Sequence, residues 1–149
     1  MDAAIAIQLV LSMVEPQSSG IGGGAFMLFF DAPASSGAPV QITAYQGREK
    51  APALATPDMF LDQNGRILDY QDSAIGGLSV GVPGVLRMLE LAHRDHGRLS
   101  WRALFEPAIE LAEKGFEISS RLNSVLEQYQ QRARAEYFTN HYYDGDGEP

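Results

Sequence analysis

The feature that most constrains this chain is a helix-forming segment with almost no polar face, which begins at the second residue. Residues 2–14 are rich in Ala, Leu, Ile and Val, and Pro16 cannot continue a helix. Only Asp2, Gln8 and Ser12 interrupt the apolar residues. A helix that is apolar nearly all round belongs inside a larger body. We therefore expect a buried N-terminal helix and a chain that is a piece of a longer polypeptide.

A glycine-rich loop and two strands are expected next. Four of the residues in 20–24 are glycines, and residues 25–30 form a continuous apolar run of strand length. Such a run predicts a strand that is buried on both faces. Residues 40–46 alternate in polarity and contain β-branched side chains, which predicts a second strand. We expect the two strands to pair as an antiparallel hairpin, although the turn region 31–39 is longer than a usual hairpin loop.

The second half of the chain has helical patterns. Proline, serine and glycine at suitable places predict helices over residues 57–61, 83–96, 100–114 and 119–137. The order of a helix, two strands and then helices predicts an α+β fold with helices against a sheet, and two strands are too few for a complete sheet. We expect residues 1–149 to be one partial domain without an internal boundary.

Composition excludes several classes of function. The chain has 11 Lys and Arg against 19 Asp and Glu, a net charge of -8, which argues against a nucleic-acid partner. It has no apolar run of the roughly 18 residues that a membrane span requires. Cysteine is absent, so disulfides, thiolate metal sites and a cysteine nucleophile are excluded.

The glycine clusters at residues 20–24 and 76–84 do not predict nucleotide binding. A dinucleotide fingerprint has a strand before its glycines and a helix after them, and a Walker loop ends in Lys followed by Ser or Thr. The first cluster lies between a helix and a strand and has no such Lys. We expect it to let the incoming strand pack tightly against a neighbouring backbone.

Three polar groups are weak candidates for chemistry. His93 and His96 are three residues apart on a predicted helix, but no third metal ligand accompanies them. Residues 139–141, Thr-Asn-His, lack a base held in fixed geometry. The acidic residues of 144–148 lack the spacing of an EF-hand loop. We expect no metal site, no cofactor and no complete catalytic constellation in this chain.

Arg48 and Glu49 follow the second predicted strand. An arginine at a strand end offers a planar fork that matches a substrate carboxylate. The alternative interpretation is a surface arginine within the solvated triplet Arg-Glu-Lys at 48–50. Residue pattern alone favours the second interpretation.

Several stretches taken together point to a family. They include Val14-Glu-Pro-Gln-Ser-Ser-Gly-Ile-Gly-Gly-Gly24, Gly47-Arg-Glu-Lys-Ala-Pro-Ala53 and Phe105-Glu-Pro-Ala-Ile-Glu-Leu-Ala-Glu-Lys-Gly-Phe116. The other stretches are residues 2–6, 25–28, 56–61, 77–84 and 96–97. In this order they resemble the large subunit of the γ-glutamyltransferase family, also called glutathione hydrolases. The resemblance covers residues 2 to 122, and the rest of the chain matches less distinctively.

The resemblance implies an N-terminal-nucleophile hydrolase fold, a four-layer α/β/β/α sandwich of which this chain would be a part. Family members are made as a precursor that cleaves itself into a large and a small subunit. The small subunit would be the partner of this chain. The N-terminal Thr of that subunit is the nucleophile of the family, and the α-amine of the same Thr is the base. The acyl group of a γ-glutamyl amide such as glutathione then passes to water, an amino acid or a peptide. Export to the periplasm is implied by the resemblance alone.

The resemblance also assigns site residues. The family's Arg in the Arg-Glu-x-Ala-Pro stretch binds the α-carboxylate of the γ-glutamyl group, and the matching residue is Arg48. Glu49 would orient that arginine. The nucleophilic Thr segment of the family is not in this chain, and residues 139–141 do not match it. We therefore expect no catalytic residue here and no activity from this chain alone. Two alternatives are a non-catalytic truncated homologue and a sibling acylase that acts on related amides.

Overall fold

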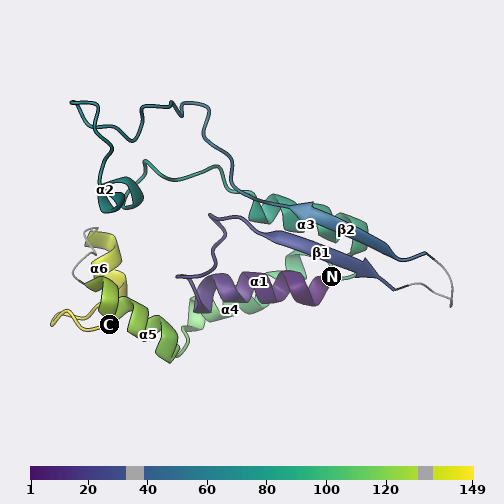
Figure 1. Ribbon diagram of the computed structural model, residues 1–149. Coiled ribbons are helices and arrows are strands. Elements are labelled where there is room, and N and C mark those ends of the chain that lie inside the picture. The colour runs from purple at the N-terminus through teal and green to yellow at the C-terminus, as the bar shows by residue number, and fades with distance from the viewer. Residues whose placement is uncertain (33–38, 131–135) are drawn as a thin grey trace. The chain divides into compact units, whose positions relative to one another are not determined.

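The computed structural model describes residues 1–32, 39–130 and 136–149 (Figure 1). In chain order the elements are α1 (Asp2–Val14), β1 (Phe26–Asp31), β2 (Gln41–Gln46), α2 (Tyr70–Ala74), α3 (Val85–His96), the 3₁₀ helix η1 (Trp101–Leu104), α4 (Glu106–Lys114), α5 (Ser120–Tyr129) and α6 (Glu136–Tyr142). Mixed helices and a small sheet confirm the α+β class. No described helix has the length and hydropathy of a membrane span.

The chain divides into two compact units. One comprises residues 21–95, and the other comprises residues 1–20 together with 96–149. The single partial domain expected from the sequence stays a prediction, and each unit is described here by itself.

The unit of residues 21–95 is built on the hairpin of β1 and β2. The two strands are antiparallel, with Phe26 opposite Gln46 and Asp31 opposite Gln41, which confirms the expected pairing. Residues 33–38 of the expected turn region lie outside the described part of the chain. Helix α3 is joined to the hairpin by a side-chain contact. The Tyr45 hydroxyl on β2 donates a hydrogen bond of 2.9 Å to Asp95 of α3.

Burial of β1 on both faces was a wrong expectation for this chain. Phe26, Leu28 and Phe30 are each more than half exposed, whereas Met27 and Phe29 between them are partly buried. Alternate side chains of a strand point to opposite faces, so one face of β1 is apolar and exposed. The reason is that no element among the described residues covers that face.

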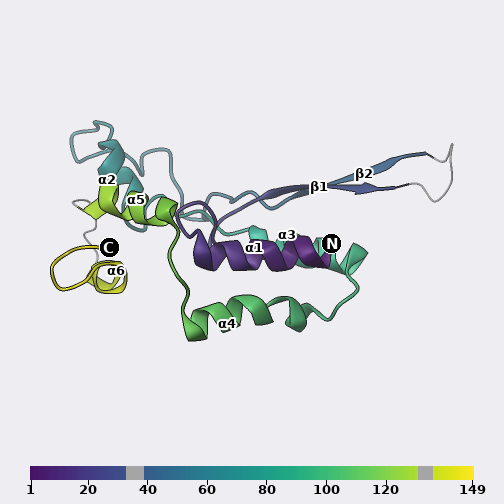
Figure 2. The same cartoon turned by 90° about the horizontal axis from the view of Figure 1, so that it is seen from below.

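In the other unit, α1 contacts α4 and η1, and Figure 2 shows α4 alongside α1. Ile5 and Leu9 of α1 are almost fully buried. The carboxylate of Asp2 accepts hydrogen bonds from the backbone amides of Arg98 and Leu99, at 3.1 and 2.9 Å. Ile7 and Leu11 are exposed, so the helix buries one side only and not the whole circumference that its composition predicted.

Helix boundaries were predicted in part. Helices α1 and α3 lie where the sequence placed them, and Gly115, with φ of 77°, ends α4. Ser100 caps the 3₁₀ helix η1 and not α4. The predicted helix over residues 57–61 is wrong, because this segment forms turns, and α2 was not predicted.

The last predicted helix, 119–137, matches α5 only at its start. The Ser119 hydroxyl caps α5 by accepting a hydrogen bond from the Leu122 amide, as expected, and it also donates one to Glu15. Helix α5 ends at Tyr129 and α6 begins at Glu136. The part of the predicted helix at 131–135 lies outside the described residues.

Two leucines of α3 provide a test of this packing. Leu89 is 1% exposed and Leu91 is 41% exposed. In the full-length protein, Leu89→Ala should lower the free energy of unfolding by about 2–5 kcal/mol, because it leaves a cavity. Urea unfolding measures the change, and Leu91→Ala is the matched control with a smaller expected loss. Equal losses for the two variants would contradict the assigned burial.

Ionisation of Tyr45 provides a second test. Burial, followed by the hydrogen bond and negative charge of Asp95, raises the pKa of Tyr45 above its ordinary value of 10.0. The folded state therefore prefers the neutral phenol, so this stabilisation is complete below pH 10 and is lost as pH rises through the folded-state pKa. Tyrosinate absorbance is followed against pH for the full-length protein and for Tyr45→Phe. The difference between the two titration curves should have its midpoint above pH 10. A midpoint at or below 10 would contradict the contact with Asp95.

Candidate functional site

Arg48 and Glu49 lie between two backbone bridges. Ala25 and Gly47 exchange two backbone hydrogen bonds, of 3.2 and 2.8 Å, which extend the hairpin one pair beyond β2. Lys50 and Val82 exchange two more, also of 3.2 and 2.8 Å. Because both flanking residues are paired, the backbone that carries the two side chains is fixed on either side.

The glycine loop joins the same region to the start of α3. The carbonyl of Gly23 accepts hydrogen bonds of 3.2 Å from the amides of Gly84 and Val85. The first amides of a helix have no partner within it, so this carbonyl satisfies two groups that the helix would otherwise leave open. A Cβ on Gly84 would lie 2.5 Å from the Gly47 carbonyl oxygen. The close backbone packing expected of residues 20–24 is found at Gly24, where a Cβ would lie 2.6 Å from the same carbonyl oxygen, and not at Gly22, where a Cβ would meet nothing within 4 Å.

The Arg48 side chain is 65% exposed, and its Nη1 lies 3.0 Å from Glu49 Oε2. Glu49 is less exposed, at 27%, and its Oε2 atom is buried. That oxygen has the distance of an ion pair but accepts no hydrogen bond within the described part of the chain. The guanidinium has five N–H donors, more than this single contact uses.

A hollow of about 350 Å³ lies beside this pair. Its charged lining consists of Arg48, Glu49 and Lys50. The rest of its wall comes from two loop segments and is mostly apolar: Ala51, Pro52, Ala55, Met59, Phe60, Leu78, Ser79, Val80 and Gly81. The family motif indicates the arginine, but no pattern in the sequence indicates this wall, because the approach of residues 51–60 to residues 78–81 has no period in either segment.

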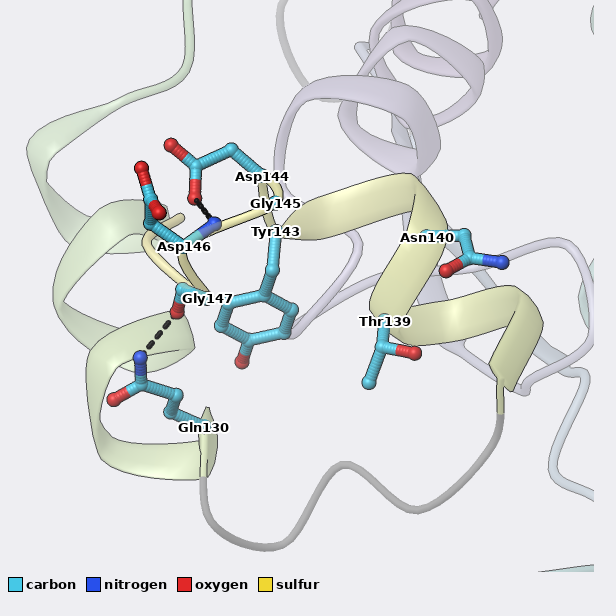
Figure 3. Close-up of a pocket in the computed structure, with 8 residues that line it drawn as sticks. All are labelled: Gln130, Thr139, Asn140, Tyr143, Asp144, Gly145, Asp146 and Gly147. Carbon is cyan, nitrogen blue, oxygen red and sulfur yellow. Dashed lines mark hydrogen bonds between the residues drawn. The ribbon is translucent and has the colours of Figure 1, made fainter.

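A second hollow, of about 340 Å³, lies at the C-terminal segment (Figure 3). The Gln130 side chain donates a hydrogen bond to the Gly147 carbonyl. Asp144 Oδ1 accepts hydrogen bonds of 2.9 Å from the backbone amides of Asp146 and Glu148. These bonds organise a turn. Figure 3 shows Thr139 on α6, separate from the turn that carries the two aspartates.

The other weak candidates from the sequence do not form a site in this structure. His93 and His96 both lie on α3 and are partly buried. Across the residues that the structure describes, no three His, Asp or Glu side chains are grouped so that they could hold a metal ion.

Comparison with known proteins gives one family. The family model described as gamma-glutamyltranspeptidase matches residues 1–149. The glutathione hydrolase proenzyme of Bacillus subtilis (strain 168) is 47% identical over 131 residues, which are 88% of this chain and 22% of the relative. This chain therefore spans about a fifth of the length of that relative.

Solved structures give the same result. The gamma-glutamyltranspeptidase of Helicobacter pylori superposes with a TM-score of 0.87 and 33% identity, over 99% of this chain and 40% of that one. The transpeptidase CapD of Bacillus anthracis superposes with a TM-score of 0.73 and 30% identity, over 99% of this chain and 42% of that one. The helices and the hairpin described above are thus part of the fold of these N-terminal-nucleophile hydrolases.

Proposed function

Because this chain belongs to the gamma-glutamyltranspeptidase family, we propose that it is part of an enzyme that cleaves γ-glutamyl amides such as glutathione. The observation that carries the proposal is the placement of Arg48. Its backbone is held between two bridges, and its largely exposed side chain lines a hollow.

Arg48 would bind the α-carboxylate of the γ-glutamyl group. A guanidinium forms two parallel hydrogen bonds to a carboxylate, which fixes both its position and its orientation. A lysine would supply the charge without that geometry. The role proposed for Arg48 is therefore recognition of the substrate and not bond cleavage.

Glu49 would orient Arg48. Its buried oxygen lies 3.0 Å from Nη1, so one end of the guanidinium has a fixed partner, while the Arg48 side chain as a whole is 65% exposed. Fixing a flexible side chain before binding reduces the conformational entropy that is lost when the ligand arrives.

The bond cleavage itself would depend on a Thr outside this chain. In this mechanism the Thr hydroxyl attacks the γ-carbonyl carbon while the α-amine of the same residue takes the proton. The new C–O bond replaces the C–N bond, and the amine leaves with the proton. Water, an amino acid or a peptide then takes the γ-glutamyl group and regenerates the hydroxyl. This chain supplies the carboxylate anchor that places the γ-carbonyl before the nucleophile.

The partner proposed for this chain is a small subunit that carries this Thr. The Bacillus subtilis relative is named a proenzyme, which fits a precursor that is cleaved into two chains. The apolar side chains of Phe26, Leu28 and Phe30 also suit a further layer of the same enzyme, because an exposed apolar surface gains from being covered.

A sibling acylase is the second candidate. The observation that keeps it open is the superposition on CapD, whose name gives a transpeptidase without a γ-glutamyl specificity. The two candidates share the fold and differ in the amide that the arginine would orient.

Replacement of Arg48 tests the anchor. In the full-length protein, Arg48→Ala should raise KM for γ-glutamyl-p-nitroanilide about ten- to hundredfold and change kcat little. The reason is that hydrogen bonds to charged groups contribute about 1.5–3 kcal/mol, and a loss of uniform binding appears in KM. Steady-state release of p-nitroaniline measures both constants.

Two controls accompany that measurement. Arg87→Ala removes an exposed arginine of α3 that pairs with Glu90, and it should leave KM unchanged. The second control is 4-aminobutyryl-p-nitroanilide, which lacks the α-carboxylate, so Arg48→Ala should not worsen its KM. An unchanged KM for the γ-glutamyl substrate would rule out the anchor.

The number of chains tests the two-subunit arrangement. Intact mass spectrometry of the purified full-length protein should show two species, because the precursor cleaves itself, and the second should begin with Thr. A single uncleaved or truncated species without release of p-nitroaniline would instead support the non-catalytic homologue.

A further inference from the structure

We propose that Gly24 and Gly81 are positioning residues for substrate recognition, because their lack of side chains leaves the space in which Glu49 lies and from which it holds Arg48. This inference rests on the proposed function, since it concerns how Arg48 is presented to an α-carboxylate. It gives the glycine loop a role that neither nucleotide binding nor simple flexibility describes.

Gly24 closes one side of this space. A Cβ built on Gly24 would lie 2.6 Å from Glu49 Oε2 and 2.9 Å from Glu49 Cδ. It would also lie 2.6 Å from the carbonyl oxygen of Gly47. Gly24 is not among the residues with positive φ, so the requirement for glycine is one of space and not of backbone conformation. Any other residue would have to displace both this carboxylate and the Gly47 carbonyl.

Gly81 bounds the space around the Glu49 side chain close to its Cβ atom. A Cβ on Gly81 would lie 2.8 Å from Glu49 Cβ and 3.3 Å from the carbonyl oxygen of Lys50. The Cβ of Glu49 cannot move away by rotation of the side chain, so this contact would shift the backbone of the arginine segment itself. Two glycines that are far apart in sequence therefore converge on one glutamate.

The convergence matters because little else holds Glu49. Its Oε2 atom is buried, yet it accepts no hydrogen bond from the described residues. It forms an ion pair of 3.0 Å with Arg48 Nη1. The position of the carboxylate is thus set by the space that the glycines leave, and the position of the guanidinium is set by the carboxylate.

Four alanine variants of the full-length enzyme test the inference. Gly24→Ala and Gly81→Ala should each raise KM for γ-glutamyl-p-nitroanilide about three- to tenfold, which is the effect of freeing one or two side chains that were held in place. Gly22→Ala and Gly77→Ala are the matched controls, because a Cβ at either position meets nothing within 4 Å. Neither control should change KM, and kcat should change little in all four variants.

A double-mutant cycle separates positioning from general damage. If Gly24 acts through Arg48, then Gly24→Ala should add nothing to KM once Arg48→Ala is present. Substrate lacking the α-carboxylate, 4-aminobutyryl-p-nitroanilide, should show no KM change with either glycine variant. A loss that is additive with Arg48→Ala, or equal for both substrates, would overturn the inference.

Glu49→Gln tests the same inference without disturbing the backbone. This variant keeps the shape of the side chain and removes its charge. It should raise KM for the γ-glutamyl substrate, and it should not raise KM further in the Arg48→Ala background.

The proposed function and this inference fail differently. If Arg48→Ala leaves KM unchanged, the proposed anchor is lost and the inference with it. If Arg48→Ala raises KM while Gly24→Ala, Gly81→Ala and Glu49→Gln match the controls, only the inference is lost.

Discussion

The unit of residues 21–95 depends on a junction of three backbone segments. Ala25 pairs with Gly47, Lys50 pairs with Val82, and the Gly23 carbonyl accepts the first amides of α3. Buried backbone groups must find partners, and here each segment satisfies the others. Backbones approach this closely only where no Cβ intervenes, and a Cβ on Gly84 would lie within 2.8 Å of two backbone atoms of Gly47. The hairpin, the start of α3 and the loop that carries Arg48 are all held by this one arrangement.

The candidate site follows from that junction. Arg48 is largely exposed, and an exposed arginine ordinarily loses rotamer freedom when it binds a ligand. The bridges on either side of residues 48–49 fix the backbone, and Glu49 forms an ion pair with the Arg48 side chain. Residues 51–60 and 78–81 contribute a mostly apolar wall to the hollow, and apolar surroundings strengthen an interaction between charges.

The exposed apolar face of β1 gives the site its wider setting. Phe26, Leu28 and Phe30 point away from the α3 side of the hairpin, and a protein surface rarely leaves large apolar side chains grouped in this way. The relatives that share this fold are several times longer than this chain. In the proposed function, a layer from the rest of such an enzyme would complete the sheet and carry the nucleophile.

The sequence by itself determined the local features. Pro16 and Gly115 end helices, Ser119 caps α5, and the β-branched residues of 40–46 form a strand, because these effects depend on neighbours a few residues away. The family motifs also identified Arg48. The tertiary structure decided which of the predicted elements form and which faces are buried. Residues 57–61 form turns beside the hollow and not a helix, and the apolar strand β1 is covered on one face only. It alone brings Gly24 and Gly81 so close to Glu49 that a Cβ at either glycine would overlap that side chain, although the three residues belong to separate segments. Steric contacts of that kind are set by packing and have no period in the sequence.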